Sequence, residues 1–199
     1  CLVGSEMCIR DRVFTGRERF EPGNPQEGYS PSPQERQSWL QISYMKEAYH
    51  TMGPKFTLGW MAEALYSSKN FSENYTATMM QAGEFAPTPH SKLMYNEAFR
   101  ANQYVAAGIK PIYVLNDMFQ FRTEFYGFTP IFPIKKNALN KAYYGKAFSR
   151  FEYMGEVSVI CHLPFGAISA YVNHYSSPRR EWNCLLYTSD AADDLIGVD

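Results

Sequence analysis

Apolar and polar residues alternate with a period of two in several stretches of this chain, and this pattern constrains the fold more than any other feature. In residues 118–128, which read MFQFRTEFYGF, one face carries aromatic side chains and the other carries polar and charged ones. Neighbouring side chains of a strand point to opposite faces, whereas a helix repeats every 3.6 residues. The alternation therefore predicts extended strands and an all-β fold.

Five further stretches follow the same rule. The pattern is weakest in residues 39–50, where Lys46 interrupts the apolar face. The other four stretches are residues 56–66, 103–113, 150–162 and 167–175, and a seventh strand is predicted to begin at 181–183. The high content of aromatic residues, 15 Tyr and 14 Phe, agrees with a β-rich chain.

The connections between these stretches alternate between short and long. Tight turns are predicted at 51–54, 115–117 and 164–166, and the longer links are 67–101, 132–146 and 176–181. Strands of about ten residues match the length of a tilted membrane strand. Short turns on one side and longer loops on the other are typical of up-and-down membrane barrels. We therefore predict a partial antiparallel up-and-down transmembrane β-barrel, comprising about six to seven strands of a larger barrel.

A barrel wall contacts lipid on its outside and water in its lumen, so the alternation predicts two sets of residues. The predicted lipid-facing set is Phe56, Leu58, Trp60, Val105, Ile109, Phe119, Phe121, Phe125, Phe151, Val157 and Val159. The predicted lumen-facing set is Gln120, Arg122, Glu124, Arg150, Glu152 and Glu156. Trp39, Trp60, Tyr66 and Trp182 are predicted to form aromatic girdles at the membrane interfaces.

The two ends of the chain are unusual. Residues 7–11 can be back-translated into a DNA word whose reverse complement encodes residues 184–189. Two ends of a protein rarely encode opposite strands of one DNA word, so we interpret both as translated sequencing-adapter tags on a metagenomic fragment. The expected organisation is a non-native tag over 1–12, a loop over 13–35, a barrel fragment over 36–183 and a second tag over 184–199.

This interpretation changes how composition is read. Three of the four cysteines lie in the tags, which leaves Cys161 and no basis for a disulfide framework. Without the tags the chain is weakly basic, which is too little charge to indicate nucleic-acid binding. The expected partners are membrane lipids and the rest of the same barrel.

The remaining residues contain no recognisable catalytic or metal-binding motif. Cys161 and His162 are adjacent in a predicted strand, so they are expected to point to opposite faces. The four histidines, His50, His90, His162 and His174, lack metal-ligand spacing. The chain contains no G-x-S-x-G motif for a nucleophilic serine. We therefore expect no catalytic residue, metal or cofactor in this chain, while link 67–101 is long enough to fold back or to bind something.

Several segments, taken in order, resemble a known family. They are FAPTPHSK at 85–92, YGKAFS at 144–149, LPFGAISA at 163–170 and NHY at 173–175. Together they resemble the C-terminal barrel of patatin-like outer-membrane proteins of Bacteroidetes-type bacteria, which is similar to the Omp85 (bacterial surface antigen) family. The similarity covers most of 36–183. It implies roughly the last third to half of a 16-stranded barrel that follows a secreted patatin lipase domain.

The resemblance implies an anchor or translocation pore in the outer membrane of a Gram-negative bacterium, belonging to a lipid acyl hydrolase whose catalytic domain lies outside this sequence. Two alternatives remain open at this point. One is an Omp85-type assembly or secretion barrel without an enzyme domain, and the other is a soluble β-sandwich binding module.

Overall fold

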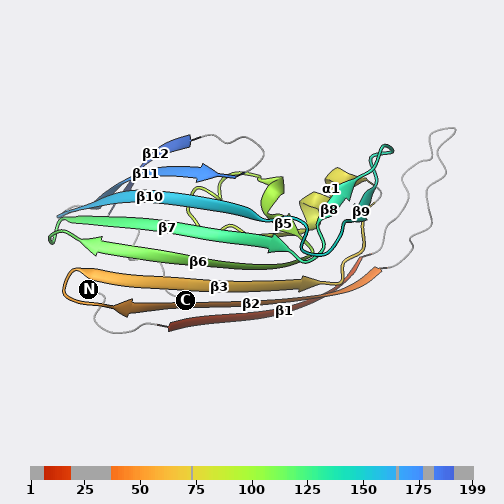
Figure 1. Cartoon of the computed structure of the whole chain (residues 1–199), viewed down its shortest axis with the longest axis horizontal. Coiled ribbons are helices and arrows are strands. Elements are labelled where there is room, and N and C mark those ends of the chain that lie inside the picture. Colours follow the sequence, from red (N-terminus) through yellow and green to blue (C-terminus); the bar gives the residue numbers. More distant parts are fainter. Residues whose placement is uncertain (1–6, 19–36, 73, 165, 177–181, 191–199) are drawn as a thin grey trace.

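Eight long strands form one antiparallel sheet in the computed structural model of the chain. The structure describes residues 7–18, 37–72, 74–164, 166–176 and 182–190. Each strand pairs with its neighbours in chain order, so the large sheet has up-and-down topology (Figure 1). Its strands are β1 (Met7–Glu18), β2 (Gln37–Thr51), β3 (Phe56–Ser67), β6 (Gln103–Val114), β7 (Phe119–Pro130), β10 (Glu152–Leu163), β11 (Gly166–Tyr175) and β12 (Trp182–Asp190).

All six alternating stretches lie largely within strands of this sheet, which confirms the predicted all-β, antiparallel, up-and-down arrangement. The boundaries differ slightly, because Arg150 and Phe151 precede β10 and Met118 precedes β7. The described strands form one large sheet and two two-stranded ribbons, rather than the two packed sheets of a sandwich.

The strand count and the predicted loop over 13–35 need correction. The sheet has eight strands rather than six to seven, because β1 adds a strand before the first predicted one. Residues 13–18 of the predicted loop belong to β1, where Val13 and Phe14 favour a strand and every residue pairs with β2. Residues 19–35 of that loop lie outside the described residues. β1 and β12 also extend into 7–12 and 184–190, and the origin of these tags stays a prediction.

Two of the three predicted tight turns, at 51–54 and 115–117, join strands at one end of the sheet, whereas residue 165 of the third lies outside the described residues. Between β2 and β3, the Met52 amide donates to the Phe56 carbonyl at 2.8 Å, and Gly53 adopts φ of 140°, which favours glycine. Between β6 and β7, the Asn116 side-chain oxygen accepts hydrogen bonds from the amides of Met118 and Phe119 at 3.0 and 2.8 Å. Both turns keep the paired strands in the register that the alternation requires.

Two of the predicted long links lie at the opposite end, and residues 177–181 of the third lie outside the described residues. Residues 68–102, called the returning segment below, contain α1 (Tyr75–Gln81), β4 (Gly83–Glu84), the 3-10 helix Glu97–Phe99 and β5 (Arg100–Ala101). The next long link carries the ribbon of β8 (Ile134–Lys136) and β9 (Ala142–Tyr144). Figure 1 shows α1, β8 and β9 together at the end of the sheet away from the tight turns.

The returning segment folds back onto one face of the sheet, as its length suggested. Phe85 and Phe99 are buried in a cluster with sheet residues. The Phe85 ring lies 6.1 Å from Tyr104, 6.0 Å from Tyr126 and 5.8 Å from Phe128, measured between ring centroids. Burial of these large rings is the main apolar contribution that holds the segment in place. No helix in the described part of the chain is long and apolar enough to span a membrane.

Candidate functional site

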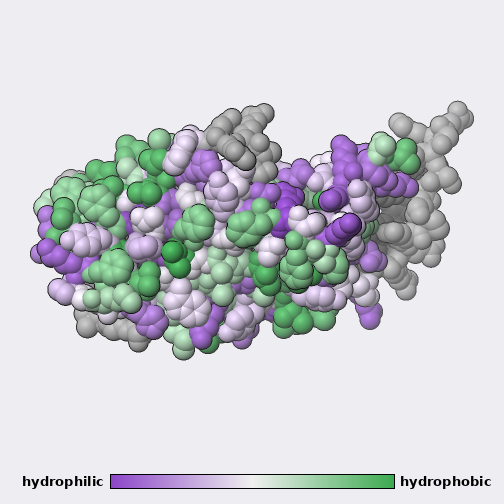
Figure 2. Space-filling view, viewed as in Figure 1, coloured by the Kyte–Doolittle hydropathy of each residue, from purple (hydrophilic) through white to green (hydrophobic). Residues whose placement is uncertain are grey.

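The sheet has two chemically different faces. The inner face is defined here as the one that carries Tyr104, Tyr126 and Phe128 and is covered by the returning segment; the outer face is the opposite one. In the view of Figure 2, hydrophobic side chains gather over the strands, and hydrophilic ones gather around β8 and β9.

The residues predicted to face lipid belong to the outer alternation, apart from Phe151, which precedes β10 and whose ring lies against Gly127 of that face. Phe121 and Phe125 remain 42% and 49% exposed, and Val105, Ile109 and Val157 are exposed as well. Their neighbours on adjacent strands are also apolar, as in the cross-strand row of Trp60, Ile109 and Phe125. The outer face is therefore largely apolar over β3, β6, β7 and β10, with Lys46 on β2 as an exception, and its contact with lipid stays a prediction.

A row of polar residues crosses the inner face at one level. Tyr49 pairs with Gly59, which pairs with Lys110 on β6. Glu124 pairs with Glu156, which pairs with Asn173. We call Tyr49, Lys110, Glu124, Glu156 and Asn173 the inner polar row. The predicted lumen-facing residues Glu124 and Glu156 thus meet directly across neighbouring strands.

Ion pairs and hydrogen bonds satisfy much of this row. Lys110 forms an ion pair with Glu47, which also accepts a hydrogen bond from the Tyr49 hydroxyl at 2.6 Å. Glu124 accepts a hydrogen bond from the Tyr126 hydroxyl. The Arg122 guanidinium lies 3.7 Å from the Glu124 carboxylate. Most of the buried charges on this face therefore have a partner of opposite sign, as burial requires.

Two glycines on the inner face make room for the tyrosines. A Cβ atom at Gly108 would lie 2.1 Å from the Tyr126 ring, and one at Gly59 would lie 2.6 Å from the Tyr49 ring. Each glycine pairs directly with the tyrosine that covers it. The lack of a side chain at these positions allows both rings to lie flat along the sheet toward their carboxylate partners.

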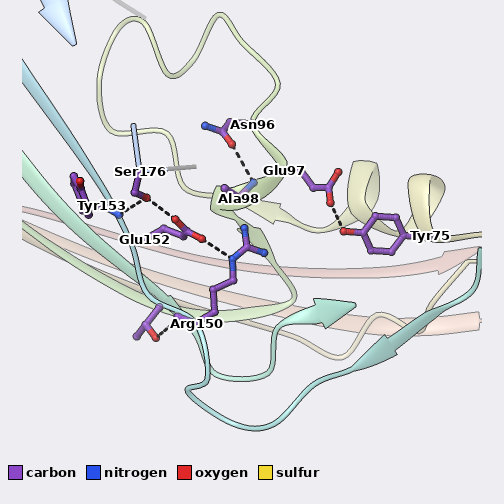
Figure 3. A network of polar contacts seen from close by, with 9 residues as sticks. Tyr75, Asn96, Glu97, Ala98, Arg150, Glu152, Tyr153 and Ser176 are labelled. Atoms are coloured by element: carbon purple, nitrogen blue, oxygen red, sulfur yellow. Dashed lines mark hydrogen bonds and ion pairs between the residues drawn. The ribbon is translucent and has the colours of Figure 1, made fainter. Parts of the chain in front are cut away.

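A second polar network lies at the end with the long connections (Figure 3). The Arg150 Nε donates to the Glu152 carboxylate at 2.8 Å, and Ser176 donates to the same carboxylate. The Tyr153 amide donates to the Ser176 hydroxyl at 3.0 Å. The predicted lumen residues Arg150 and Glu152 are therefore brought together with Ser176, where β11 ends, but not with Glu124 and Glu156.

The returning segment is attached to the sheet and to itself by polar contacts as well as by aromatic packing. Arg100 donates to the carbonyl of Met80 at 3.1 Å and forms an ion pair of 2.6 Å with Glu84. The His90 Nδ1 lies 2.7 Å from the Tyr175 hydroxyl on β11. Burial lowers the pKa of His90, which favours the neutral ring that can accept this hydrogen bond.

Other candidates from the sequence are not brought together. Cys161 follows the outer alternation and His162 the inner one. His174 stacks against Tyr153 and contacts the Trp182 ring at a tilt of 49°. The described residues contain no group of three or more His, Cys, Asp or Glu placed to hold a metal.

Trp39 departs from the predicted girdle. It pairs with Gly16 in the inner alternation, and a Cβ at Gly16 would lie 2.5 Å from its ring. Lys69 also lies over this ring, with its Nζ 4.9 Å from the centroid. Trp60, Tyr66 and Trp182 lie in the outer alternation, and their place in a girdle stays a prediction.

Sequence reasoning missed Glu47, Tyr49, Lys110, Tyr126 and Asn173 as partners in the inner network. Their positions in the alternation carried a signal, because each falls on the same side of its strand as the predicted lumen residues. The sequence carried no signal for which of these residues pair, since Glu47 and Lys110 are separated by 63 residues in the chain. Only the register of the sheet brings them together.

Comparison of the chain with protein-family models, with curated proteins and with solved structures found no match in any of the three. The family resemblance described above therefore stays a prediction based on the quoted segments.

Proposed function

We propose that this chain is part of the wall of an outer-membrane β-barrel. The single observation that carries the proposal is the difference between the faces of one continuous sheet. The outer face exposes aromatic and aliphatic side chains, whereas the inner face carries paired charges beneath the returning segment. A soluble protein rarely exposes an apolar surface of this extent, and in a bilayer that surface contacts lipid.

The edges of the sheet support a larger barrel. Within the described residues, β1 pairs only with β2, and β12 pairs only with β11. A sheet in lipid must close, because every backbone N–H and C=O there needs a partner inside the protein. In this proposal, further strands of the parent protein continue the sheet at both edges, in place of the parts of β1 and β12 that are interpreted as tags.

The proposed parent is a patatin-like lipid acyl hydrolase of a Gram-negative outer membrane. Support comes from the resemblance of the segments at 85–92, 144–149 and 163–170, in that order. In this role the barrel anchors the enzyme or provides a path for its translocation, while lipid hydrolysis belongs to a catalytic domain outside this sequence. The charged inner face suits a hydrated lumen wall, which we favour over a dedicated transport path.

Expression of the intact parent gene tests the membrane proposal. We expect the protein in the outer-membrane fraction, soluble only in detergent, with faster electrophoretic migration before boiling than after. This heat-modifiable migration reflects a closed barrel that resists unfolding in detergent. A monomeric product that stays soluble without detergent would refute the membrane assignment and favour a soluble binding module.

The sequence upstream of this segment tests the enzyme assignment separately. A G-x-S-x-G motif in an upstream domain, with loss of lipid hydrolysis on replacing its serine by alanine, is the expected result. The alternative is an Omp85-type assembly or secretion barrel without an enzyme domain. Such a barrel would have the same kind of wall, and this chain itself contains no G-x-S-x-G motif. Periplasmic repeats directly upstream, without a lipase domain, would support that alternative and exclude the hydrolase.

A further inference from the structure

The charges of the inner polar row do not balance. Glu47 is paired with Lys110, and Glu124 lies beside Arg122. Glu156 is 3% exposed and has no ion-pair partner among the described residues. One buried carboxylate therefore remains without a compensating charge, which is strongly unfavourable unless a proton or a cation neutralises it.

Unpartnered oxygen atoms lie at the same place. Asn173 is 1% exposed, and neither its Oδ1 nor its Nδ2 makes a hydrogen bond of ordinary geometry, although its side chain lies beside the Glu156 carboxyl group. The Oε2 atom of Glu156 also lacks one. These two residues are direct cross-strand partners on β10 and β11, so their side chains project side by side from the inner face. Buried polar groups in proteins are normally satisfied, which indicates that something else completes this site.

The remaining neighbours supply further oxygen atoms. Glu124 is 5% exposed and pairs with Glu156 from the other side, on β7. Two carboxylates directly opposite each other repel, and a cation between them removes this repulsion. Thr88 of the returning segment lies beside the Glu156 carboxyl group and is itself buried. The available ligands are thus carboxylate, amide and hydroxyl oxygens, which hard cations prefer.

We propose that Glu156, Asn173 and Glu124 bind a calcium ion on the inner face, with Thr88 as a further oxygen ligand. The ion ties the returning segment to strands β7, β10 and β11. Arg122 offsets part of the negative charge, so binding is expected to be weak, with a Kd of roughly 10⁻⁴–10⁻³ M, as in extracellular calcium modules. The inference rests on the inner face alone and is independent of whether the outer face contacts lipid.

Terbium luminescence provides the test, because Tb³⁺ occupies calcium sites and is sensitised by nearby tyrosines. The Tyr126 hydroxyl donates to Glu124, so its ring lies beside the proposed site. The full chain, refolded in detergent micelles, is titrated with Tb³⁺ under tyrosine excitation and then with Ca²⁺ as competitor. Potassium chloride at matched ionic strength shows what general screening alone does.

The variants are chosen to keep shape and burial. Glu156→Gln removes the unpaired charge, and Asn173→Ala removes the amide oxygen in case the first variant folds poorly. Glu152→Gln is the matched control, because Glu152 is buried on the same face of β10 but is already paired with Arg150 and Ser176.

We expect saturable luminescence that Ca²⁺ displaces and KCl does not. Its affinity should fall at least tenfold in Glu156→Gln and in Asn173→Ala and change less than twofold in Glu152→Gln. Equal titrations in wild type and Glu156→Gln would overturn the proposal. So would a wild type that responds to pH but not to Ca²⁺, because a proton would then neutralise Glu156.

Discussion

At the scale of single residues, the side of the strand on which a side chain lies decides its environment. Phe121 and Gln120 are adjacent in β7, yet Phe121 lies in the outer alternation and Gln120 in the inner one. In the proposed barrel, the first meets lipid and the second meets the lumen. The same substitution at these two positions should therefore have very different effects.

Phe121→Arg and Gln120→Arg test this difference. A charge on the lipid side near the midplane costs about 2–4 kcal/mol, so Phe121→Arg should lower the free energy of unfolding by that order, while Gln120→Arg should be nearly neutral. The comparison is made by urea unfolding of the intact barrel in lipid vesicles. Equal losses in both variants would contradict the assigned faces.

Gly108 allows a second comparison between single residues. An added Cβ would clash with the Tyr126 ring, whereas a Cβ at Gly155 would meet nothing closer than 3.8 Å. Gly108→Ala should therefore lower the free energy of unfolding by about 1–3 kcal/mol through overpacking. Gly155→Ala should change it little, or raise it slightly through the lower entropy of the unfolded chain. Both values come from urea unfolding in detergent, and similar results would show that Tyr126 does not cover Gly108.

At the scale of elements, the returning segment depends on a few anchors. Arg100 connects the end of α1 with Glu84 and lies over the Tyr95 ring at 4.8 Å. Most of its hydrogen bonds go to backbone carbonyls, so it orders the segment itself rather than the sheet. Loss of this side chain should loosen residues 68–102 and leave the strands in place.

Arg100→Met tests this role. Charge-assisted hydrogen bonds contribute about 1.5–3 kcal/mol each, so we expect much faster protease cleavage within residues 68–102 and unchanged strand content by circular dichroism. Lys92→Met is the control in the same segment, because Lys92 is an exposed side chain. Cleavage at equal rates in the two variants would show that Arg100 does not anchor the segment.

The contact between His90 and Tyr175 should depend on pH. The pKa of His90 is lowered by burial from its ordinary value of 6.5, so the unfolded segment binds a proton more readily than the folded one. The stabilisation is thus complete above pH 6.5 and is lost as the pH falls below it. Hydrogen exchange of residues 85–92 should be faster at pH 5.5 than at pH 7.5, after correction for intrinsic rates.

His90→Gln supplies the control for this pH dependence. Glutamine can still accept a hydrogen bond from the Tyr175 hydroxyl but does not titrate. The difference in protection between pH 7.5 and pH 5.5 should therefore become smaller in the variant. An unchanged difference would assign the effect to other groups.

At the scale of the whole molecule, the open edges of the sheet are expected to determine whether the chain associates with other copies. The described part of the chain leaves one edge of β1 and one edge of β12 without a neighbour, next to an apolar outer face. Unpaired edges are templates for pairing with another copy. The chain on its own should therefore associate through these edges.

Size measurements test this expectation. The 199-residue chain in detergent should form oligomers whose mass rises with protein concentration, whereas the intact parent barrel should remain one species. Multi-angle light scattering coupled to chromatography gives both masses. A chain that remains monomeric over a hundredfold range of concentration would contradict edge pairing.

The sequence by itself determined the local features, because they depend on neighbouring residues. The period of two specified strands and their faces, and residues such as Gly53 and Asn116 specified the tight turns. It did not predict β1, of which residues 13–18 were interpreted as a loop, since pairing with β2 rather than local composition decides that strand.

Tertiary structure alone decided which inner residues meet. Lys110 forms an ion pair with Glu47, and Glu156 lies opposite Asn173, because the register of the sheet aligns positions that are far apart in the chain. The tertiary structure also decides which face the returning segment covers. Phe85 and Phe99 become buried only by packing against the rings of Tyr104 and Phe128 on the inner face. Alternation assigns each residue to a side of its strand, and only the assembled sheet gives that side its partners.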